Sequence, residues 1–293
     1  MHTRHPFRSV CSALLLALLA CAPARAEPLH PALWKVADAD TTIWLFGTVH
    51  VMKPGLDWLN GPVRAALEGS DELVTEIADP TGTRTQSALM ARAMLPAGPS
   101  LRDTLDTARR TKFEALLART GLAPDALDRF KPWYAGVVLS SLPMVQRGLS
   151  PHDGVEEGLE ADKAGRPRPR SGLETVDYQL GLFDSLPQDA QLAYLDSVMD
   201  NFDHIGPEID QLFAAWGKGD AEGLAKVMND DMDDPRLTEA LITSRNRQWA
   251  AWIGKRLAVP GTVFVAVGAG HLAGPGSVQD QLARAGLVVT RVQ

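Results

Sequence analysis

Two stretches with the same ending constrain the fold more than any other feature of this chain. Residues 41–50 end in Gly47-Thr48-Val49-His50, and residues 262–271 end in Gly268-Ala269-Gly270-His271. In both, apolar and β-branched residues run continuously instead of alternating with polar ones, which is typical of a strand buried on both faces of a parallel sheet. Since helices must cover such a sheet, we predict an α/β fold with a central, mostly parallel sheet flanked by helices.

Each run places a histidine just past the end of its strand, at His50 and His271. The carboxyl edge of the strands is where open α/β sheets bind their ligands. One histidine there is more often a structural residue than a ligand, but two with the same Gly-x-x-His spacing are harder to dismiss. We therefore predict that His50 and His271 share one site, with a structural role for both as the alternative.

Two glutamates are predicted to reach the same edge. A helix within residues 58–67 leads to a second strand, residues 72–78, and this strand–helix–strand unit places Glu76 close to the edge that carries His50. Glu174 lies where an extended segment turns into a helix, which is the same kind of position. The structural alternatives are a solvated strand-end acid for Glu76 and a favourable charge at a helix N-terminus for Glu174.

The stretch after the second strand is helical in pattern and has no strand-like run. We predict a single α/β domain over residues 27–293, with a helical insertion around 82–150 that forms a cap over the carboxyl edge of the strands. The candidate helices of the insertion are residues 87–94, 108–120 and 130–142.

The remaining pattern is also mainly helical up to the second Gly-x-x-His run. We expect a Pro-containing lead-in at residues 27–40 before the first strand, and an edge strand or extended entry at 166–170. Most of the acids of the helix at 153–165 are interpreted as solvated surface, because they spread round the helix: Glu156, Glu157, Glu160 and Asp162. The other expected elements are helices at 153–165 (capped by Gly165), 176–186, 236–257 and 277–286, two or three helices within 188–228, and a strand at 288–292.

Arg245 and Asn246 lie in the middle of the predicted helix 236–257, beside its apolar stripe. An arginine and an asparagine that interrupt a buried helix need polar partners. An acidic metal or substrate site would supply those partners, and exposure to solvent is the simpler alternative.

The N-terminus has the three parts of a secretory signal peptide. Arg4 and Arg8 precede the apolar run 13–20, and Ala24-Arg25-Ala26 is a small-x-small cleavage site. We expect a protein secreted to the periplasm that begins at Glu27 after cleavage of residues 1–26. Lipoprotein processing at Cys21 is the less favoured alternative, because Leu19 is a poor residue for such a signal.

Charge and cysteine content exclude several classes of function. Residues 1–26 contain three arginines and no acid, so their removal changes the formal charge from −7 to −10, which argues against binding to nucleic acid or to anionic membrane surfaces. Both cysteines also lie in the removed segment, so the mature chain has no disulfide and no thiol chemistry. No later run is apolar enough to form an integral membrane span.

The candidate site combines two imidazoles with carboxylates. His50, His271 and Glu76 form a mixed nitrogen and oxygen set that suits a divalent transition metal, such as Mn, Co or Zn, with open positions. Glu174, or Glu76 itself, would act as ligand or base, and Arg245 with Asn246 would support the transition state. A metal-free alternative uses a histidine as general base on an oriented water. Gly-x-Ser-x-Gly, P-loop and His-Glu-x-x-His motifs are absent from the sequence.

In order and spacing, these residues resemble the TraB/GumN family, which is related to the TIKI metalloproteases and more distantly to ChaN-like and erythromycin-esterase-like proteins. Gly154-Val155-Glu156 departs from the pattern, because an Asp is expected at the third position, so the resemblance gives Glu156 no role. The resemblance covers nearly all of the mature chain and rests on residues 45–50, Glu76, Lys131-Pro132-Trp133, Gly172-Leu173-Glu174-Thr175 with Gln179, Arg245-Asn246, and residues 267–272.

The resemblance implies an α/β fold in which both Gly-x-x-His motifs and the glutamates meet in one pocket. It also implies a metal-dependent hydrolase that is peptidase-like in activity. Together with the signal peptide, this gives the first hypothesis, a periplasmic enzyme that cleaves a peptide or a small ester. The alternative is a non-catalytic periplasmic protein that uses the same pocket to sequester a peptide, a haem-like ligand or a metal. Sequence alone leaves both hypotheses open.

Overall fold

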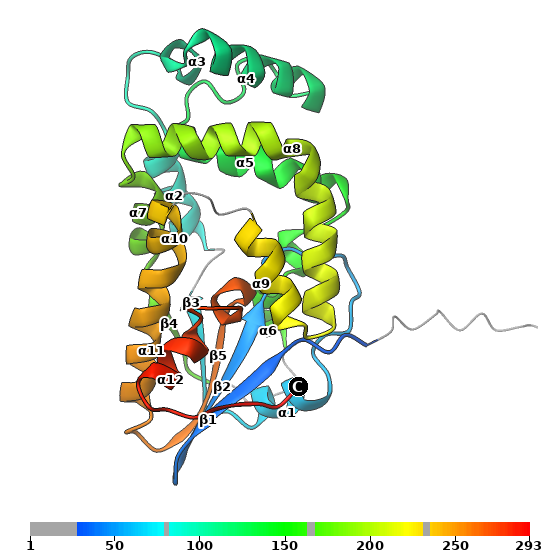
Figure 1. The fold of residues 1–293 in the computed structure, drawn as a ribbon, viewed down its shortest axis with the longest axis vertical. Helices are drawn as coiled ribbons and strands as arrows, with labels where there is room; N and C mark the ends of the chain where they lie inside the picture. Colours follow the sequence, from blue (N-terminus) through cyan, green and yellow to red (C-terminus); the bar gives the residue numbers. More distant parts are fainter. Residues whose placement is uncertain (1–27, 79–81, 163–167, 231–234) are drawn as a thin grey trace, which may run out of the picture.

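The computed structural model describes residues 28–78, 82–162, 168–230 and 235–293. The predicted signal peptide, the proposed C-cap Gly165 and the first two residues of the basic segment at 166–170 therefore lie outside the described residues. The described chain forms one six-stranded sheet with helices on both faces (Figure 1). The strands are β1 (Leu33–Ala37), β2 (Thr41–Thr48), β3 (Glu72–Ile77), β4 (Arg170–Glu174), β5 (Gly261–Gly268) and β6 (Val289–Arg291).

The sheet order is β4-β3-β5-β2-β1-β6, and the pairs β4–β3, β3–β5 and β5–β2 are all parallel. This confirms the predicted α/β fold with a mostly parallel sheet. The two Gly-x-x-His strands are direct neighbours, and their register pairs Thr48 with Gly268. Both motifs therefore leave the sheet at the same level of its carboxyl edge.

The interpretation of residues 27–40 as a lead-in without a strand was wrong. β1 lies between β2 and β6 and is antiparallel to both. Leu33 and Val36 are buried, while Trp34 and Lys35 between them are only half-buried. Five residues that follow a proline and contain a lysine give too weak a pattern to predict a strand, and the hydrogen bonds to β2 supply what local propensity does not.

The helices follow the predicted order closely. The π-helical turn and the short 3-10 turns were not predicted, because they depend on tertiary contacts more than on local pattern. The helical elements are α1 (Gly61–Glu68), α2 (Thr83–Ala93), α3 (Leu101–Thr104), α4 (Thr107–Thr120), α5 (Pro132–Gln146), η1 (Pro151–Asp153), α6 (Val155–Ala161), α7 (Val176–Asp184), α8 (Gln188–Gly217), α9 (Ala221–Asp230), α10 (Pro235–Thr238), η2 (Glu239–Thr243, π-helical), α11 (Ser244–Arg256), η3 (Ala269–Leu272) and α12 (Val278–Arg284).

The helical cap over the carboxyl edge is larger than the stretch from 82 to 150. Leu101 of α3, Phe113 of α4 and Leu139 of α5 share a core with Leu195 and Phe202 of α8. Figure 1 shows α8 crossing above the sheet beside α5 and then turning downward toward it. The bend has an identifiable cause, since Pro207 lies inside α8 and removes a backbone hydrogen bond there.

Two apolar cores hold the sheet between helices. One core joins Phe46 and Phe264 to Trp58, to Val63 of α1 and to Trp216 near the end of α8. The other joins Ile43, Val74 and Val265 to Trp249 of α11 and Leu282 of α12. Within the described ranges, no helix is both long and apolar enough to cross a membrane.

Candidate functional site

A cavity of about 380 Å³ opens at the carboxyl edge of the sheet. Its polar residues come from segments far apart in the sequence: the loop after β2, the end of β3, the start of η3 and the first turn of α11. Its walls come from the cap, chiefly from the second half of α8, from α9 and from η2. The polar and backbone groups at its base belong to Thr48, His50, Glu76, Arg245, Gly268 and His271.

Close packing explains why glycine occupies the first position of both motifs. A Cβ on Gly47 would lie 3.0 Å from Cα and Cβ of Ala269, in the loop that carries the second histidine. A Cβ on Gly268 would lie 3.1 Å from Oε1 of Glu76. Side chains at either position would separate the two histidine loops from each other or from the glutamate, so the repeated glycine is part of the geometry of the site.

His50 faces the cavity and is held from behind by Glu156. Nδ1 of His50 lies 2.8 Å from Oε1 of Glu156, and because a carboxylate only accepts, the ring donates this hydrogen bond. The His50 side chain is 70% exposed, which is compatible with a ring that borders an open cavity. The hydrogen bond to Glu156, together with the negative charge of that carboxylate, raises the pKa of His50 to about 9.

Glu156 is therefore not the solvated surface acid that the sequence suggested. Its side chain is only 16% exposed, and it reaches His50 from the first turn of α6. Burial would raise the pKa of Glu156, but the hydrogen bond from His50 lowers it. The sequence did single out Gly154-Val155-Glu156, but the family pattern favoured an aspartate in place of Glu156, so no role was assigned to this residue. In the structure, Gly154 packs directly against the carbonyl of His50 and so brings Glu156 to the ring.

His271 is held in one tautomer by Asn246. Nδ2 of Asn246 donates to the carbonyl of Gly276 at 2.9 Å, so Oδ1 of the same amide faces Nδ1 of His271 at 2.7 Å. An amide oxygen only accepts, hence Nδ1 carries the proton and Nε2 presents a lone pair. Burial lowers the pKa of His271 to about 3, which keeps the ring neutral.

Arg245 uses every N–H of its guanidinium within the protein. Nε and Nη2 donate to Glu174 at 2.9–3.2 Å, and Nη2 also donates to Oε2 of Glu76 at 2.6 Å. Nη1 donates to the carbonyl of Leu241 and to Nε2 of His271, each at 3.0 Å. An arginine has five N–H donors, and all five are engaged here. Arg245 therefore positions Glu76 and His271 and has no donor left for a substrate.

Both carboxylate oxygens of Glu76 accept hydrogen bonds from the protein. Its Oε1 accepts from the backbone N–H of Gly268 at 2.7 Å, and its Oε2 accepts from Arg245 and from Gln179 at 2.8 Å. Burial would raise its pKa, but the neighbouring charges and the Gly268 N–H lower it to about 2. Gln179 also donates to Glu174 at 2.9 Å and so ties the two glutamates together.

The structure thus gives the six predicted residues different positions. His50, Glu76, Arg245 and His271 border the cavity, whereas Glu174 and Asn246 are not among its lining residues. Glu174 has a side chain only 3% exposed and accepts further hydrogen bonds from Arg245 and from the indole N–H of Trp249. Glu174 and Asn246 act through Arg245 and His271, so their contacts do not place them beside a transition state.

The donor set fits a divalent transition metal in chemistry and in charge. Both histidines have Nδ1 tied to an oxygen acceptor, which is the support that metal-binding histidines usually receive. The carboxylates of Glu76, Glu156 and Glu174 exceed the guanidinium of Arg245 and the protonated ring of His50 by one charge, and they exceed the guanidinium alone by two once His50 gives up its proton to an entering divalent cation. Nε2 of His271 and Oε1 of Glu76 are 4.0 Å apart.

Two features of the donor set oppose metal binding, and the first is that His50, with its pKa raised to about 9, must lose a proton before it can bind an ion. The second is that Nε2 of His271 already accepts a hydrogen bond from Arg245, so an ion would have to replace that N–H. Within the part of the chain that the structure describes, no three His, Cys, Asp or Glu side chains are already gathered as a metal-binding group. Metal binding would therefore require His50, His271 and Glu76 to draw together while Arg245 keeps its contacts to Glu174.

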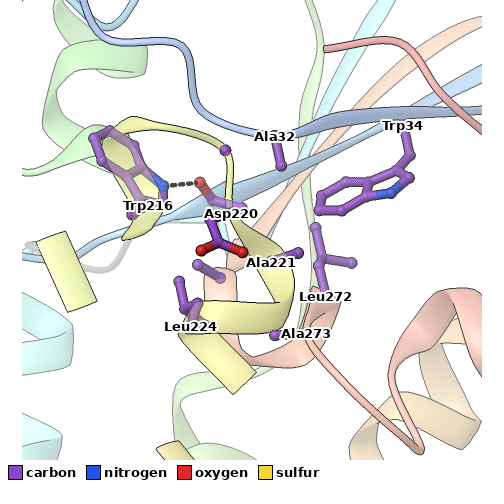
Figure 2. Close-up of a pocket in the computed structure, with 11 residues that line it drawn as sticks. Ala32, Trp34, Trp216, Asp220, Ala221, Leu224, Leu272 and Ala273 are labelled. Carbon is purple, nitrogen blue, oxygen red and sulfur yellow. Dashed lines mark hydrogen bonds between the residues drawn. The ribbon is translucent and has the colours of Figure 1, made fainter. Parts of the chain in front are cut away.

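A second hollow lies behind the first motif and is too small for a ligand. It holds about 20 Å³, enough for a single water, and is lined mainly by apolar side chains such as Trp34 and Leu272 (Figure 2). The dashed line in Figure 2 marks the hydrogen bond from Nε1 of Trp216 to the carbonyl of Gly47, 2.8 Å long. This contact fixes the end of β2 and hence the start of the loop that carries His50.

Comparisons with known proteins identify the family of this chain. The chain is 25% identical over 243 residues to the uncharacterized protein YbaP of Escherichia coli (strain K12), which covers 81% of this chain and 86% of that protein. It is 22% identical over 301 residues to an uncharacterized protein of Treponema pallidum (strain Nichols), covering 95% of this chain and 90% of that protein. No solved structure matches the chain. The family model described as TraB/PrgY/gumN matches residues 32–291, which confirms the resemblance seen in the sequence: the chain belongs to the TraB/PrgY/gumN family.

Proposed function

We propose that this protein is a metal-dependent hydrolase that cleaves a peptide or a small ester in the cavity at the carboxyl edge of its sheet. One observation carries the proposal: two histidines, each with Nδ1 held by an oxygen, border the same cavity as a buried glutamate. Side chains supported in this way are preorganised for ligation or proton transfer, whereas structural histidines seldom share an open cavity.

The residues that would hold the ion are His50, His271 and Glu76. The ion would supply Lewis acidity, both to acidify a water molecule and to polarise the substrate carbonyl. Asn246 keeps the neutral ring of His271 in the required tautomer, and Glu156 would do the same for His50 once an ion displaces the proton from its Nε2. Arg245 and Gln179 hold Glu76 in place and, with Glu174, keep the charge beneath the cavity balanced.

The second candidate function is ligand binding without catalysis. The observation that favours it is the hydrogen bond from Arg245 to Nε2 of His271, which occupies the lone pair that a metal needs. A cavity of this volume with mostly apolar walls would also suit a sequestered peptide or haem-like ligand.

The test is metal content and peptide hydrolysis of the purified mature protein, measured beside His50→Ala, His271→Ala and His152→Ala. His152 is an exposed histidine in η1 and serves as the matched control. We expect near-stoichiometric metal and cleavage from the wild type and from His152→Ala, and loss of both from the two site variants while they remain folded. If the wild type binds no divalent ion and cleaves no member of a broad peptide library, the hydrolase proposal is wrong and the non-catalytic binding function replaces it.

We also propose that the protein is exported to the periplasm with residues 1–26 removed. The support is the order of Arg4 and Arg8, the apolar run 13–20 and the Ala24-Arg25-Ala26 site. Mass spectrometry of the protein recovered from a periplasmic fraction should give a chain that begins at Glu27. A mature chain that begins at a lipid-modified Cys21 would contradict this processing.

A further inference from the structure

The upper part of the cavity has walls of one chemical kind. They come from the second half of α8, from α9 and from η2, and none of these residues carries a charge. The residues that form them are Ile209, Leu212, Phe213, Leu224, Met228 and Ile242. The charged groups that border the cavity, His50, Glu76 and Arg245, lie together at its base.

This separation restricts what a substrate can place in the cavity. A charged side chain between these walls would lose its water without gaining a partner, which is costly, whereas an apolar side chain would gain free energy by leaving water. The volume of about 380 Å³ lies at the small end of the range for ligand sites, roughly 300–1,000 Å³. It suits a short extended segment with one large side chain and excludes a folded domain.

Met228 divides this space from a second chamber. A hollow of about 100 Å³, bordered by Thr238, Pro275 and Gly276, shares Met228, Ile242 and Gly270 with the larger cavity. The thioether of Met228 lies over Gly270, since a Cβ on that glycine would be 2.7 Å from Sδ. A methionine is flexible and adapts to different apolar shapes, so this partition sets an upper limit of size without selecting one shape.

We propose that the substrate inserts an uncharged, apolar side chain between α8, α9 and η2, next to the bond to be cleaved, and that Met228 sets the largest side chain accepted. This inference rests on the proposed hydrolase for its cleavage readout, but the ligand class it names also holds for a binding protein.

The experiment uses a set of fluorescence-quenched peptides that differ at one position, which carries Ala, Leu, Phe, Trp, Ser, Asp or Lys. We expect kcat/KM to be at least about tenfold higher for Leu or Phe than for Ala, since one methylene in an apolar pocket changes discrimination by roughly 10–200-fold. Asp and Lys should give the lowest values. Equal values across the set would overturn the inference while leaving the hydrolase intact.

Variants at Met228 test the partition directly. Met228→Ala joins the two chambers and should raise kcat/KM for the Trp peptide relative to the Leu peptide by about tenfold. Met228→Phe should shift the preference the other way, toward Ala. Met90→Ala removes an exposed methionine from α2 and should leave the order of preference unchanged. If neither Met228 variant changes the size preference, Met228 does not set the limit and the inference fails.

Binding separates this inference from the proposed function. The same residues are placed in peptides blocked at both ends, and their affinities for the wild-type protein are measured by titration calorimetry. If no peptide is cleaved but Leu and Phe peptides bind more tightly than Asp and Lys peptides, the hydrolase fails and the ligand class stands. If peptides are cleaved but bind and react without apolar preference, the hydrolase stands and the ligand class fails.

Discussion

Replacing Arg245 by methionine tests the charge balance beneath the cavity. The arginine side chain is only 9% exposed, and its guanidinium donates to both Glu76 and Glu174, which are also largely buried. Breaking a buried ion pair by removing one partner costs about 3–5 kcal/mol, because the remaining charges have lost their counter-ion. For a chain of this size, that corresponds to a fall of roughly 6–20 °C in Tm. A chelator should be present throughout so that no ion compensates the lost charge.

The pH dependence of this effect has a definite sign. The pKa of Glu76 is lowered to about 2 in the folded protein, with Arg245 among the causes, so its ionised form adds stability above the unfolded pKa near 4.5. That stability is lost as the pH falls from about 4.5 toward 2. Without Arg245 the pKa of Glu76 rises, so the difference in unfolding free energy between wild type and variant should be largest at pH 7 and smaller at pH 4.

Two further proteins make the measurement decisive. Arg247→Met removes an exposed arginine from the same helix, where it pairs with the exposed Glu239, and should cost no more than about 1 kcal/mol. The triple variant Glu76→Gln, Glu174→Gln, Arg245→Met removes the buried arginine together with both of its carboxylate partners and should recover most of the lost stability. Urea unfolding at pH 7 and pH 4 gives all of these values. A loss for Arg245→Met that is below about 1 kcal/mol, or independent of pH, would refute the reasoning.

Two other predictions concern the histidine loop and the motif glycine. Glu156→Gln should lower the pKa of His50 from about 9, as measured by NMR titration of the ring, whereas the neighbouring Glu157→Gln should leave that pKa unchanged. A raised histidine pKa stabilises the folded protein below about pH 6.5, and this stabilisation is lost as the pH rises through 9. Glu156→Gln should therefore destabilise the protein more at pH 6 than at pH 10. An unchanged His50 titration would show that Glu156 does not hold its proton. Gly47→Ala should lower the free energy of unfolding in urea by about 1–3 kcal/mol, because the new methyl group meets Ala269 at 3.0 Å. Gly181→Ala, in helix α7, should raise it by about 0.5–1 kcal/mol, because beyond its own helix no atom of the described residues lies within 4 Å of the new methyl group. Equal effects of the two substitutions would exclude close packing as the reason for Gly47.

Sequence reasoning found the base of the site because strand periodicity and sheet topology act together there. Once two buried strands ended in the same Gly-x-x-His motif, a parallel pairing in register was enough to bring His50 and His271 to one edge. It did not find Glu156, because an acid on a short amphipathic helix has the same local pattern whether it faces solvent or a histidine. Its partner is 106 residues away along the chain, and tertiary contacts bring the two together: Gly154 packs on the carbonyl of His50, and the backbone N–H of Val155 donates to the carbonyl of Val49.

The cavity walls were beyond the reach of sequence patterns for a related reason. Leu212, Phe213, Met228 and Ile242 belong to helices whose apolar stripes look like ordinary core faces. They border a cavity because Pro207 turns the second half of α8 toward the sheet, so that its stripe stands above the polar groups without packing down onto them. A proline in a helix predicts a bend but not its direction, and the direction decides whether those side chains fill a core or leave room for a ligand.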